Sequence, residues 1–459
     1  MVIDINKKEG RLNFSKIDFN KYDYVIVGTG PSGIVLIDTL LKKKKKILVI
    51  DRGNFQEKKY ESVISKKIKI KKKSKTFAIG GTSLDWSQIY SYLDEIELND
   101  RSTLHNKWPI SHGDLIKYYR KLDKKFKFDY KNLKKKNFDI PFLSRKFVAP
   151  IKPCNFRKFI NFEKVDLLIN CKVNTVDTKN KIIFLYLQNQ NFKKVVNVRK
   201  IILCNGGIES TSLILRSIKD NKLKNLRNKK FVGKYFMDHP KSYVGVIKSP
   251  KREIIEKIKL KKTKDQISYY GLSLTKKEQY SKRLLNTYFR FEQNNIKTNY
   301  ITDPLVKSLN YLFNYFKINN SKLNTDNNTY NLRVFFEMFP SVRNGIKINK
   351  YNKTIIDLNY SNIEIKTFNI LIKKIFKFFS YDYKKENIIL LNKKNIFKLK
   401  DASHHMGGLI YPKIVDKNLK FRGLEGIYCC SSSIFPTSGS VNPTFTTCAL
   451  AVRLGKYLN

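Results

Sequence analysis

The chain has 459 residues, of which 41% are hydrophobic and 13% aromatic, enough apolar material for a large core. No run of about 18 apolar residues occurs, so the sequence excludes a transmembrane helix. The 92 Lys and Arg residues against 38 Asp and Glu residues give a formal net charge of +54, which is typical of proteins that bind polyanions. The lysines are spread along the chain, however, as drift in an AT-rich gene produces. We therefore expect no specific nucleic-acid partner and leave peripheral association with anionic surfaces open.

The cysteines favour buried, reduced thiols. No CxxC spacing occurs, and most cysteines lie in apolar segments, which argues against a disulfide framework and a zinc site. We therefore predict no metal. The N-terminal stretch MVIDINKKEGRLNF lacks the positive start and apolar run of a signal peptide, so we expect a cytoplasmic location. The six cysteines are Cys154, Cys171, Cys204, Cys429, Cys430 and Cys448.

A dinucleotide-binding pattern begins at Tyr22, where the sequence reads YDYVIVGTGPSGIVLIDTLLKKKKKILVIDRG. YVIVG and KILVID predict two strands around a helix, which together form a βαβ unit. Gly28 permits the tight turn, Gly30 lets the backbone approach a pyrophosphate, and Gly33 allows close packing of helix and strand. The helix start attracts phosphate, and Asp51 is spaced to accept the ribose hydroxyls. The pattern predicts a dinucleotide but does not distinguish NAD from FAD.

Further segments follow up to Pro240. IGGTSLDWSQIYSYLDEIELND begins at Ile79, and KWPISHGDLIKYYRK begins at Lys107. KVDLLINCKVNTVDTKNKIIFLYL predicts strands with turns, and RKIILCNGGIESTSLILRS predicts a strand, a glycine turn and a helix. FVGKYFMDHP closes this part of the chain.

The next part predicts a sheet with helices on one face. KSYVGVIKS, QISYYGLSL and NTYFRFEQ are β-rich runs, whereas DPLVKSLNYLFNYF and TFNILIKKIFKFF have helical apolar spacing. Such a layer would cover the reactive side of a cofactor bound by the first part.

The C-terminal part reads HHMGG and then GLEGIYCCSSSIFPTSGSVNPTFTTCALAVRLGKYL. Together with the N-terminal segments in this order, these motifs make the chain resemble the glucose–methanol–choline (GMC) family of FAD-dependent oxidoreductases. The GGTS and WPIS segments are most similar to the branch of pyranose 2-oxidase and bacterial sugar dehydrogenases. The resemblance covers residues 20–240 and 400–459 and is thin between them, where only YNLRVFFEMFPSVRNGIKI is similar.

The resemblance implies an α/β protein in which a Rossmann-like FAD-binding domain is joined to an α+β substrate domain of a sheet plus helices. We expect residues 1–240 to form the FAD-binding domain with loop insertions, and residues 241–400 to form the substrate-binding domain. Residues 401–459 would then return to the FAD-binding domain with the catalytic residues.

The resemblance also assigns the catalytic residues. The base of the family is the His of His-x-x-Gly, which here is His404, and its partner maps to Asn442. A neutral imidazole suits this role because its pKa lies near the working pH. His405 would point to the other side of an extended segment, since neighbouring side chains alternate. The residues themselves leave open that His405 or neither histidine is the base, and His239 is expected to brace a turn through hydrogen bonds.

By the same resemblance the cofactor is FAD. Some relatives attach FAD through a His two residues after GGTS, where this chain has Asp85, so we expect non-covalent FAD. Asn442 precedes Pro443, which predicts a helix whose positive end faces the flavin. The predicted cofactor-binding residues are Gly28, Gly30, Pro31, Ser32, Gly33, Asp51, Arg52, Gly80, Gly81, Thr82, Trp86, Val173, Cys204, Asn205, Gly206, Ser433, Pro443 and Thr444.

These features predict an enzyme that oxidises a CH–OH group of a sugar or another small alcohol by hydride transfer to flavin N5, with an electron acceptor that the sequence does not identify. One alternative is a flavoprotein of the same fold that acts on a carbonyl or a glycan-assembly intermediate. A second alternative is a basic polyanion-binding protein with a vestigial enzyme fold. The intact glycine pattern, His404 and Asn442 argue against the second alternative.

Overall fold

The centre of the molecule is a six-stranded, all-parallel sheet with the strand order β1-β8-β3-β2-β12-β21. The computed structural model describes residues 1–65, 67–99, 107–122, 125–133, 138–190, 192–248, 251–293, 329–379 and 388–458. The strands are β1 (Val2–Asp4), β2 (Tyr24–Val27), β3 (Ile47–Ile50), β8 (Asp166–Ile169), β12 (Ile201–Leu203) and β21 (Ile427–Cys429). This arrangement confirms the predicted Rossmann-like α/β architecture.

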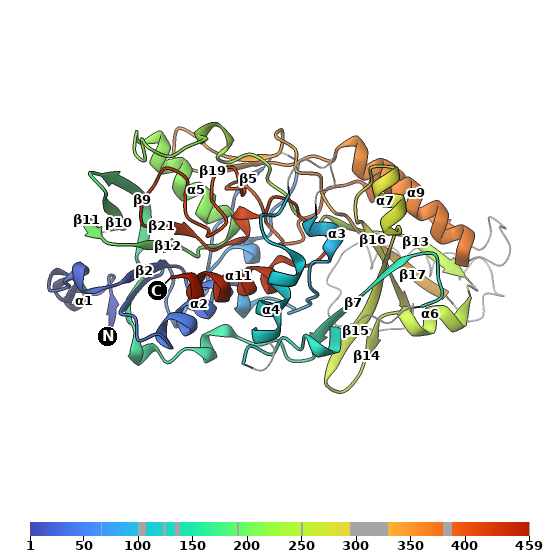
Figure 1. Ribbon diagram of the computed structural model, residues 1–459, viewed down its shortest axis with the longest axis horizontal. Helices are drawn as coiled ribbons and strands as arrows, with labels where there is room; N and C mark the ends of the chain where they lie inside the picture. Colours follow the sequence, from blue (N-terminus) through green and yellow to red (C-terminus); the bar gives the residue numbers. More distant parts are fainter. Residues whose placement is uncertain are drawn as a thin grey trace.

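The central strands are short apolar runs without alternation. Every residue of β2, β3, β12 and β21 is buried, as expected for a parallel sheet that is covered on both faces. The covering helices include α2 (Pro31–Leu41), α5 (Gly206–Lys219) and α11 (Pro443–Tyr457). α11, at the end of the chain, packs against α2, near its start (Figure 1). Both ends of the sequence therefore build one domain.

A second, seven-stranded sheet forms the other half of the molecule. Its order is β14-β15-β16-β17-β13-β20, with β7 paired to β15, and all of these pairings are antiparallel. The helix α9 (Asn362–Phe379) lies along this sheet on the outer side of the molecule (Figure 1). The strands are β7 (Leu143–Pro150), β13 (Lys241–Lys248), β14 (Lys261–Lys262), β15 (Gln266–Ser273), β16 (Tyr288–Gln293), β17 (Thr329–Phe335) and β20 (Ile388–Leu390).

This sheet matches the three β-rich runs and the second helical run of the sequence prediction. The first helical run, residues 303–316, lies outside the described residues. The predicted boundaries at 240 and 400 do not follow the two sheets everywhere. Strand β7 precedes residue 240 yet pairs with β15, whereas β19 (Thr354–Asp357) pairs with β5 (Ile64–Ser65) on one side and with β18 (Gly345–Ile348) on the other. The chain therefore crosses between the two halves more often than a three-part division allows.

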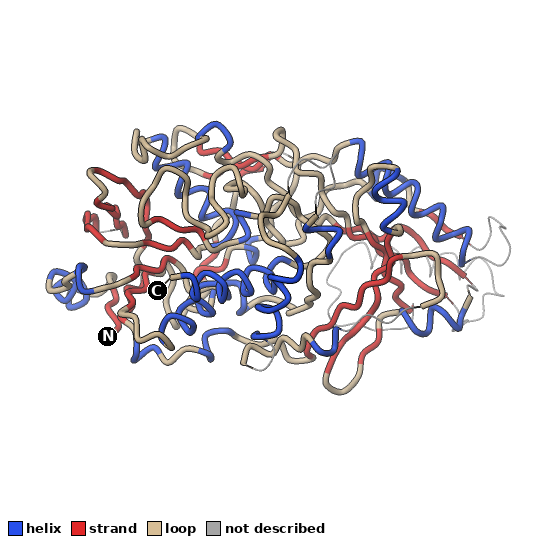
Figure 2. Tube along the Cα trace, viewed as in Figure 1, coloured by secondary structure: helices blue, strands red, loops and turns tan. Residues whose placement is uncertain are grey.

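The remaining elements surround these two sheets. A three-stranded antiparallel meander follows β8, and loops and turns fill much of the region between the two large sheets (Figure 2). No helix among the described residues is both long enough and apolar enough to cross a bilayer. The helices and strands that surround the two large sheets are α1 (Lys8–Ser15), β4 (Lys59–Tyr60), β6 (Thr76–Phe77), α3 (Glu95–Leu98), α4 (His112–Leu122), the meander strands β9 (Lys172–Lys179), β10 (Ile182–Asn189) and β11 (Phe192–Val198), α6 (Arg252–Ile258), α7 (Lys276–Ser281) and α10 (Lys393–Ile396).

Candidate active site

A cavity opens at the carboxyl ends of the central strands, where open α/β sheets bind their ligands. Val27 of β2 and Ile50 of β3 line it, together with the N-terminal ends of α2, α5 and α11. Free N–H groups and partial positive charge at these helix ends suit phosphate.

The glycines of the first motif make this cavity possible. Gly28 has φ +98°, and a Cβ at Gly33 would lie 2.1 Å from the Gly28 carbonyl oxygen. At Gly30 the nearest atom to such a Cβ is 3.9 Å away, so this position opens into the cavity. A Cβ at Gly81 would lie 2.9 Å from the Cα of Gly30, which brings the two glycine-rich loops into contact. The backbone of Gly30 is thus accessible to a pyrophosphate, as the sequence predicts.

Asp51 lies at the end of β3 on the cavity wall. Its carboxylate accepts hydrogen bonds from the Thr29 N–H (2.8 Å), the Thr29 hydroxyl (2.6 Å) and the Gly53 N–H (2.7 Å). Burial raises the pKa of Asp51, although these hydrogen bonds act in the opposite direction. Asp51 therefore fixes the turn after β2 as well as facing the cavity, and its contact with a ribose stays a prediction.

Four cations line the cavity, and only one of them was predicted. Arg52 is joined by Lys75, Lys172 and Arg216, while Glu209 is paired with Lys75 (Nζ to Oε1, 2.6 Å). Burial would raise the pKa of Glu209, but Lys75 and Arg216 lower it to about 2. Burial, with Arg216 and Arg52 nearby, lowers the pKa of Lys172 to about 8. A pyrophosphate would compensate this excess of positive charge, so the residues present fit FAD.

The structure brings most of the predicted cofactor residues to one cavity. Gly33, Gly80, Trp86 and Ser433 do not line it. Gly80 N–H donates to the Thr29 hydroxyl (3.1 Å), Trp86 Nε1–H donates to the Cys154 carbonyl (2.9 Å), and the Ser433 hydroxyl meets that of Ser431 (2.6 Å). The predicted residues that line the cavity are Gly28, Gly30, Pro31, Ser32, Asp51, Arg52, Gly81, Thr82, Val173, Cys204, Asn205, Gly206, Pro443 and Thr444.

Two histidines from distant segments meet beside this cavity. Nδ1 of His404 lies 3.2 Å from Nδ1 of His239, and Nε2 of His239 lies 2.9 Å from the Gly439 carbonyl oxygen. A carbonyl only accepts, so His239 carries its proton on Nε2. Neutral His239 then accepts at Nδ1, and His404 must donate from its own Nδ1. Nε2 of His404 is left with a free lone pair, which is what a general base requires.

The surroundings keep both histidines neutral. Burial and then the neighbouring His239 hold the pKa of His404 well below its usual range, with Lys241 acting in the same direction. Burial also lowers the pKa of His239, although Asp238 opposes this. The sequence predicted that His239 would brace a turn, and it does contact the Gly439 carbonyl. Its contact with His404 was missed, because 165 residues separate the two and no local pattern links them.

His405 lies on the other side of the segment. Its Nε2 is 2.9 Å from Oδ1 of Asp401, and the residue lines the cofactor cavity. Burial lowers the pKa of His405, but the neighbouring Asp401 carboxylate outweighs this and raises it. Asp238 accepts from the backbone N–H groups of Ala402 (2.7 Å) and His404 (2.9 Å) and so fixes this segment. The atoms of Asp238, Asp401 and His405 that could bind a metal lie within 4.8 Å of one another, so the prediction that the protein has no metal site stays untested.

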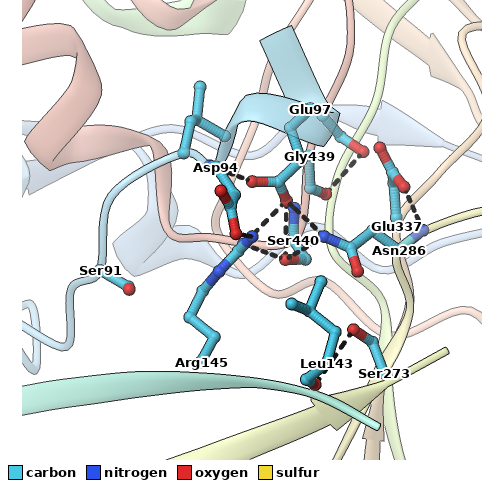
Figure 3. A network of polar contacts seen from close by, with 12 residues as sticks. Ser91, Asp94, Glu97, Leu143, Arg145, Ser273, Asn286, Glu337, Gly439 and Ser440 are labelled. Carbon is cyan, nitrogen blue, oxygen red and sulfur yellow. Dashed lines mark hydrogen bonds and ion pairs between the residues drawn. The ribbon is translucent and has the colours of Figure 1, made fainter. Parts of the chain in front are cut away.

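A buried polar network holds the loop that precedes Asn442 (Figure 3). Oε1 of Glu97 accepts from Arg145 (2.8 Å), from the Ser440 N–H (2.6 Å) and from Asn286 (3.1 Å). Burial would raise the pKa of Glu97, but Arg145 lowers it, so the carboxylate stays charged. The same loop carries Gly439, whose carbonyl fixes His239. Sequence reasoning found none of these anchors.

Asn442 is the residue before α11, with Pro443 at the first helical position as predicted. Its side chain makes no capping hydrogen bond to the helix and is partly exposed, so its amide is available to a ligand. His404 and Asn442 do not line the cofactor cavity themselves. Residues next to them in the sequence do line it: Ser403 and His405 around His404, and Pro443 and Thr444 after Asn442. Both predicted catalytic residues therefore lie at its border.

Comparison with known proteins identifies the family. Residues 343–451 match the family model described as GMC oxidoreductase. The chain carries the C-terminal domain of the GMC oxidoreductases. This match confirms the family predicted from the motifs and supports FAD as the cofactor. The particular branch within the family stays a prediction, and among curated protein sequences none matches the chain.

The fold of this chain is shared with solved structures. A pyridoxine 4-oxidase from Mesorbium loti has a TM-score of 0.60 at 13% identity, with 95% of this chain and 99% of that chain covered. A fungal aryl-alcohol oxidase has a TM-score of 0.60 at 11% identity, covering 96% and 99%. An FAD-dependent oxidoreductase from Chaetomium thermophilum has a TM-score of 0.59 at 14% identity, covering 95% and 98%. At these identities the similarity establishes the architecture.

Proposed function

We propose that this protein oxidises the CH–OH group of a small alcohol, such as a sugar, to a carbonyl. The observation that carries the proposal is the chain of contacts from the Gly439 carbonyl through His239 to His404, which leaves a lone pair on His404 Nε2. Bound FAD would supply the acceptor for the hydride that leaves the carbon. The protein has to supply the acceptor for the hydroxyl proton and to hold the oxygen in line.

His404 takes the proton in this proposal. Its low pKa keeps the imidazole neutral at physiological pH, so the lone pair on Nε2 is present before the substrate arrives. As the proton moves to Nε2, positive charge develops on the ring. The hydrogen bond from Nδ1–H to His239, and from His239 to the Gly439 carbonyl, stabilises that charge while keeping the ring in place.

Asn442 holds the substrate oxygen. Its amide can donate to the hydroxyl oxygen without titrating, and the Glu97–Ser440 contacts fix the loop from which it projects. The helix α11 begins directly after it, so the positive end of the helix favours negative charge on whatever lies against it. These placements support a role in orientation rather than in proton transfer.

The proposal is tested by anaerobic reduction of the purified protein. The protein should be yellow, should release intact FAD on denaturation, and should lose its flavin absorbance when mixed with one member of a panel of sugars and primary alcohols. Dithionite serves as the control that the bound flavin can be reduced. A yellow protein that dithionite bleaches but no alcohol reduces would contradict the proposal.

A further inference from the structure

The second sheet has two unlike faces. Side chains alternate along each strand, and Phe289, Phe291, Leu332 and Val334 form one face, which packs against α9. The opposite face of β13, β16 and β17 carries the alternate residues. These residues are Lys241, Tyr243, Tyr288, Arg290, Glu292, Arg333 and Phe335.

Strand register brings the cations of this second face together. Arg333 of β17 is paired with Arg290 on one side and with Tyr243 on the other, and Phe335 is paired with Lys241. The guanidinium groups rest on aromatic rings, with Arg290 4.6 Å from the Tyr269 ring centre and Arg333 4.8 Å from that of Tyr243. Such stacking fixes the orientation of the two planar forks.

This cluster has more positive than negative charge. Its three cations face one carboxylate, Glu292, which accepts from Arg290 Nε (2.7 Å) and the Tyr243 hydroxyl (3.0 Å). Arg333 Nη1 lies 3.8 Å from the same carboxylate and donates to the Tyr243 hydroxyl (3.4 Å), while its Nε is buried without a hydrogen-bond partner. Among the described residues, Nζ of Lys241 makes no ion pair or hydrogen bond. Cations that are partly or fully removed from water and lack counter-charges are costly, so an anion bound at this face would be stabilised.

The cluster lies on the side of the catalytic base. Lys241 is two residues after His239, which contacts His404. The charge of Lys241 lowers the pKa of His404, and burial together with Arg333, Lys71 and Arg290 lowers the pKa of Lys241 itself to about 7. Tyr288 and Phe335 of the same face pack with the core of the FAD-binding half. The face is therefore directed toward the cofactor side and not toward α9.

We propose that the alcohol oxidised at this site carries an anionic group, a phosphate or a carboxylate, and that Lys241, Arg333 and Arg290 bind it. The inference rests on the proposed oxidation for its chemistry but on the sheet for its geometry. Planar guanidinium forks pair with both kinds of anion through two parallel hydrogen bonds. The anchored anionic group then determines which alcohol carbon of the substrate lies next to the flavin and is oxidised, through the distance between the two groups.

Binding of inorganic phosphate to the FAD-loaded protein tests the anion site directly. At constant ionic strength, phosphate should perturb the visible flavin spectrum with saturation. Arg333→Gln and Lys241→Met should each raise the apparent Kd at least about tenfold, whereas Lys347→Met, which removes an exposed lysine of β18, should leave it unchanged. Lys241→Met breaks no ion pair, so it guards against misfolding of the arginine variant. Phosphate binding that is absent, or equal in all four proteins, overturns the inference.

Flavin reduction by matched alcohols separates this inference from the proposed function. A neutral sugar, its 6-phosphate and its uronic acid are compared, and the better of the two anions identifies which one is preferred. Half-maximal reduction should require at least about tenfold less of the preferred anionic sugar than of the neutral one, and Arg333→Gln should remove that difference. If neutral alcohols reduce the flavin rapidly, and neither Arg333→Gln nor Lys241→Met changes the reduction, the proposed function stands and the anion site is overturned. If phosphate binding depends on Arg333 but no alcohol reduces the flavin, the anion site stands and the proposed function is overturned.

Discussion

Among the residues of the site, the position of one proton decides the chemistry. His404 can act as a base only through a nitrogen that has no hydrogen, and its Nδ1 is committed to His239. The sequence places His239 in an MDHP segment far from His404, and its ring is fixed by the Gly439 carbonyl (2.9 Å). In the proposed mechanism, His239 is therefore a positioning residue, since it would act on the substrate only through His404.

Replacement of His239 tests this role. His239→Leu removes the acceptor for His404 Nδ1–H, so both tautomers become populated, and flavin reduction at saturating substrate should slow by about tenfold or more. Because His239 also lowers the pKa of His404, the acidic limb of the rate profile should move to higher pH in the variant. In the wild type the rate should stay level from about pH 9 to below about pH 6.5, the usual pKa of His. His239→Gln can still accept a hydrogen bond and should recover part of the rate. A purely structural role predicts an unmoved acidic limb.

Lys172 gives a second prediction at the same scale. Only the charged amine attracts the pyrophosphate, and its pKa in the free protein is about 8. FAD affinity should therefore be highest below this pH and fall as the pH rises through about 8, because deprotonation removes one favourable charge. Titration of the apoprotein with FAD, followed by flavin fluorescence, measures this. Lys172→Met should bind FAD more weakly at pH 7, and its FAD affinity should no longer fall as the pH rises through about 8. If the affinity of this variant still falls in the same way, another group causes the fall.

At the scale of elements, the loop between β21 and α11 depends on a carboxylate from α3. Glu97 is fully buried and holds Ser440 and Arg145, whereas Glu95 of the same helix is exposed and pairs with Lys276 (3.2 Å). Glu97→Gln leaves Arg145 without its closest counter-charge, so unfolding free energy should fall by about 3 kcal/mol, the usual cost of breaking a buried pair. Glu95→Gln is the matched control and should cost less than about 0.5 kcal/mol.

The flavin reduction rate completes this prediction. Because Ser440 and Gly439 support Asn442 and His239, Glu97→Gln should also slow reduction in the fraction that remains folded. Denaturant unfolding and rapid-mixing reduction are measured on the same samples. Equal stability of the two variants would show that the loop does not depend on Glu97.

The local elements were largely predictable, and their long-range contacts were not. The strand–turn–helix at residues 24–41, the strands after Asp166 and the helix that starts at Pro443 follow from apolar runs, glycine turns and a proline at a helix start. The pairing of β7 with β15 and of Glu97 with Ser440 joins segments more than 100 residues apart, which no periodicity encodes. Lys75, Lys172 and Arg216 also escaped notice, because a lysine-rich sequence gives no reason to single them out.

For the whole molecule, the charge of +54 has to be reconciled with an enzyme. If the charge reflects composition, nucleic-acid binding should be weak, independent of sequence and lost steeply with salt, as counterion release requires. Binding to duplexes of unrelated sequence at low and physiological salt measures this. Tight binding that survives physiological salt and prefers one sequence would instead support a binding protein built on an enzyme fold.

The most direct test of the account compares the two adjacent histidines. His404 lies outside the cofactor cavity and His405 lines it. His404→Ala should therefore keep FAD bound and slow flavin reduction at saturating substrate by about 10²–10⁴-fold, the usual contribution of a positioned base. His405→Ala breaks the pair with Asp401, so it should lower stability and FAD affinity while changing the reduction rate of the loaded enzyme far less. Rapid-mixing reduction of both variants by the best alcohol of the panel decides the matter: a severe loss in His405→Ala with a mild one in His404→Ala, or mild losses in both, would contradict the assignment of His404 as the base.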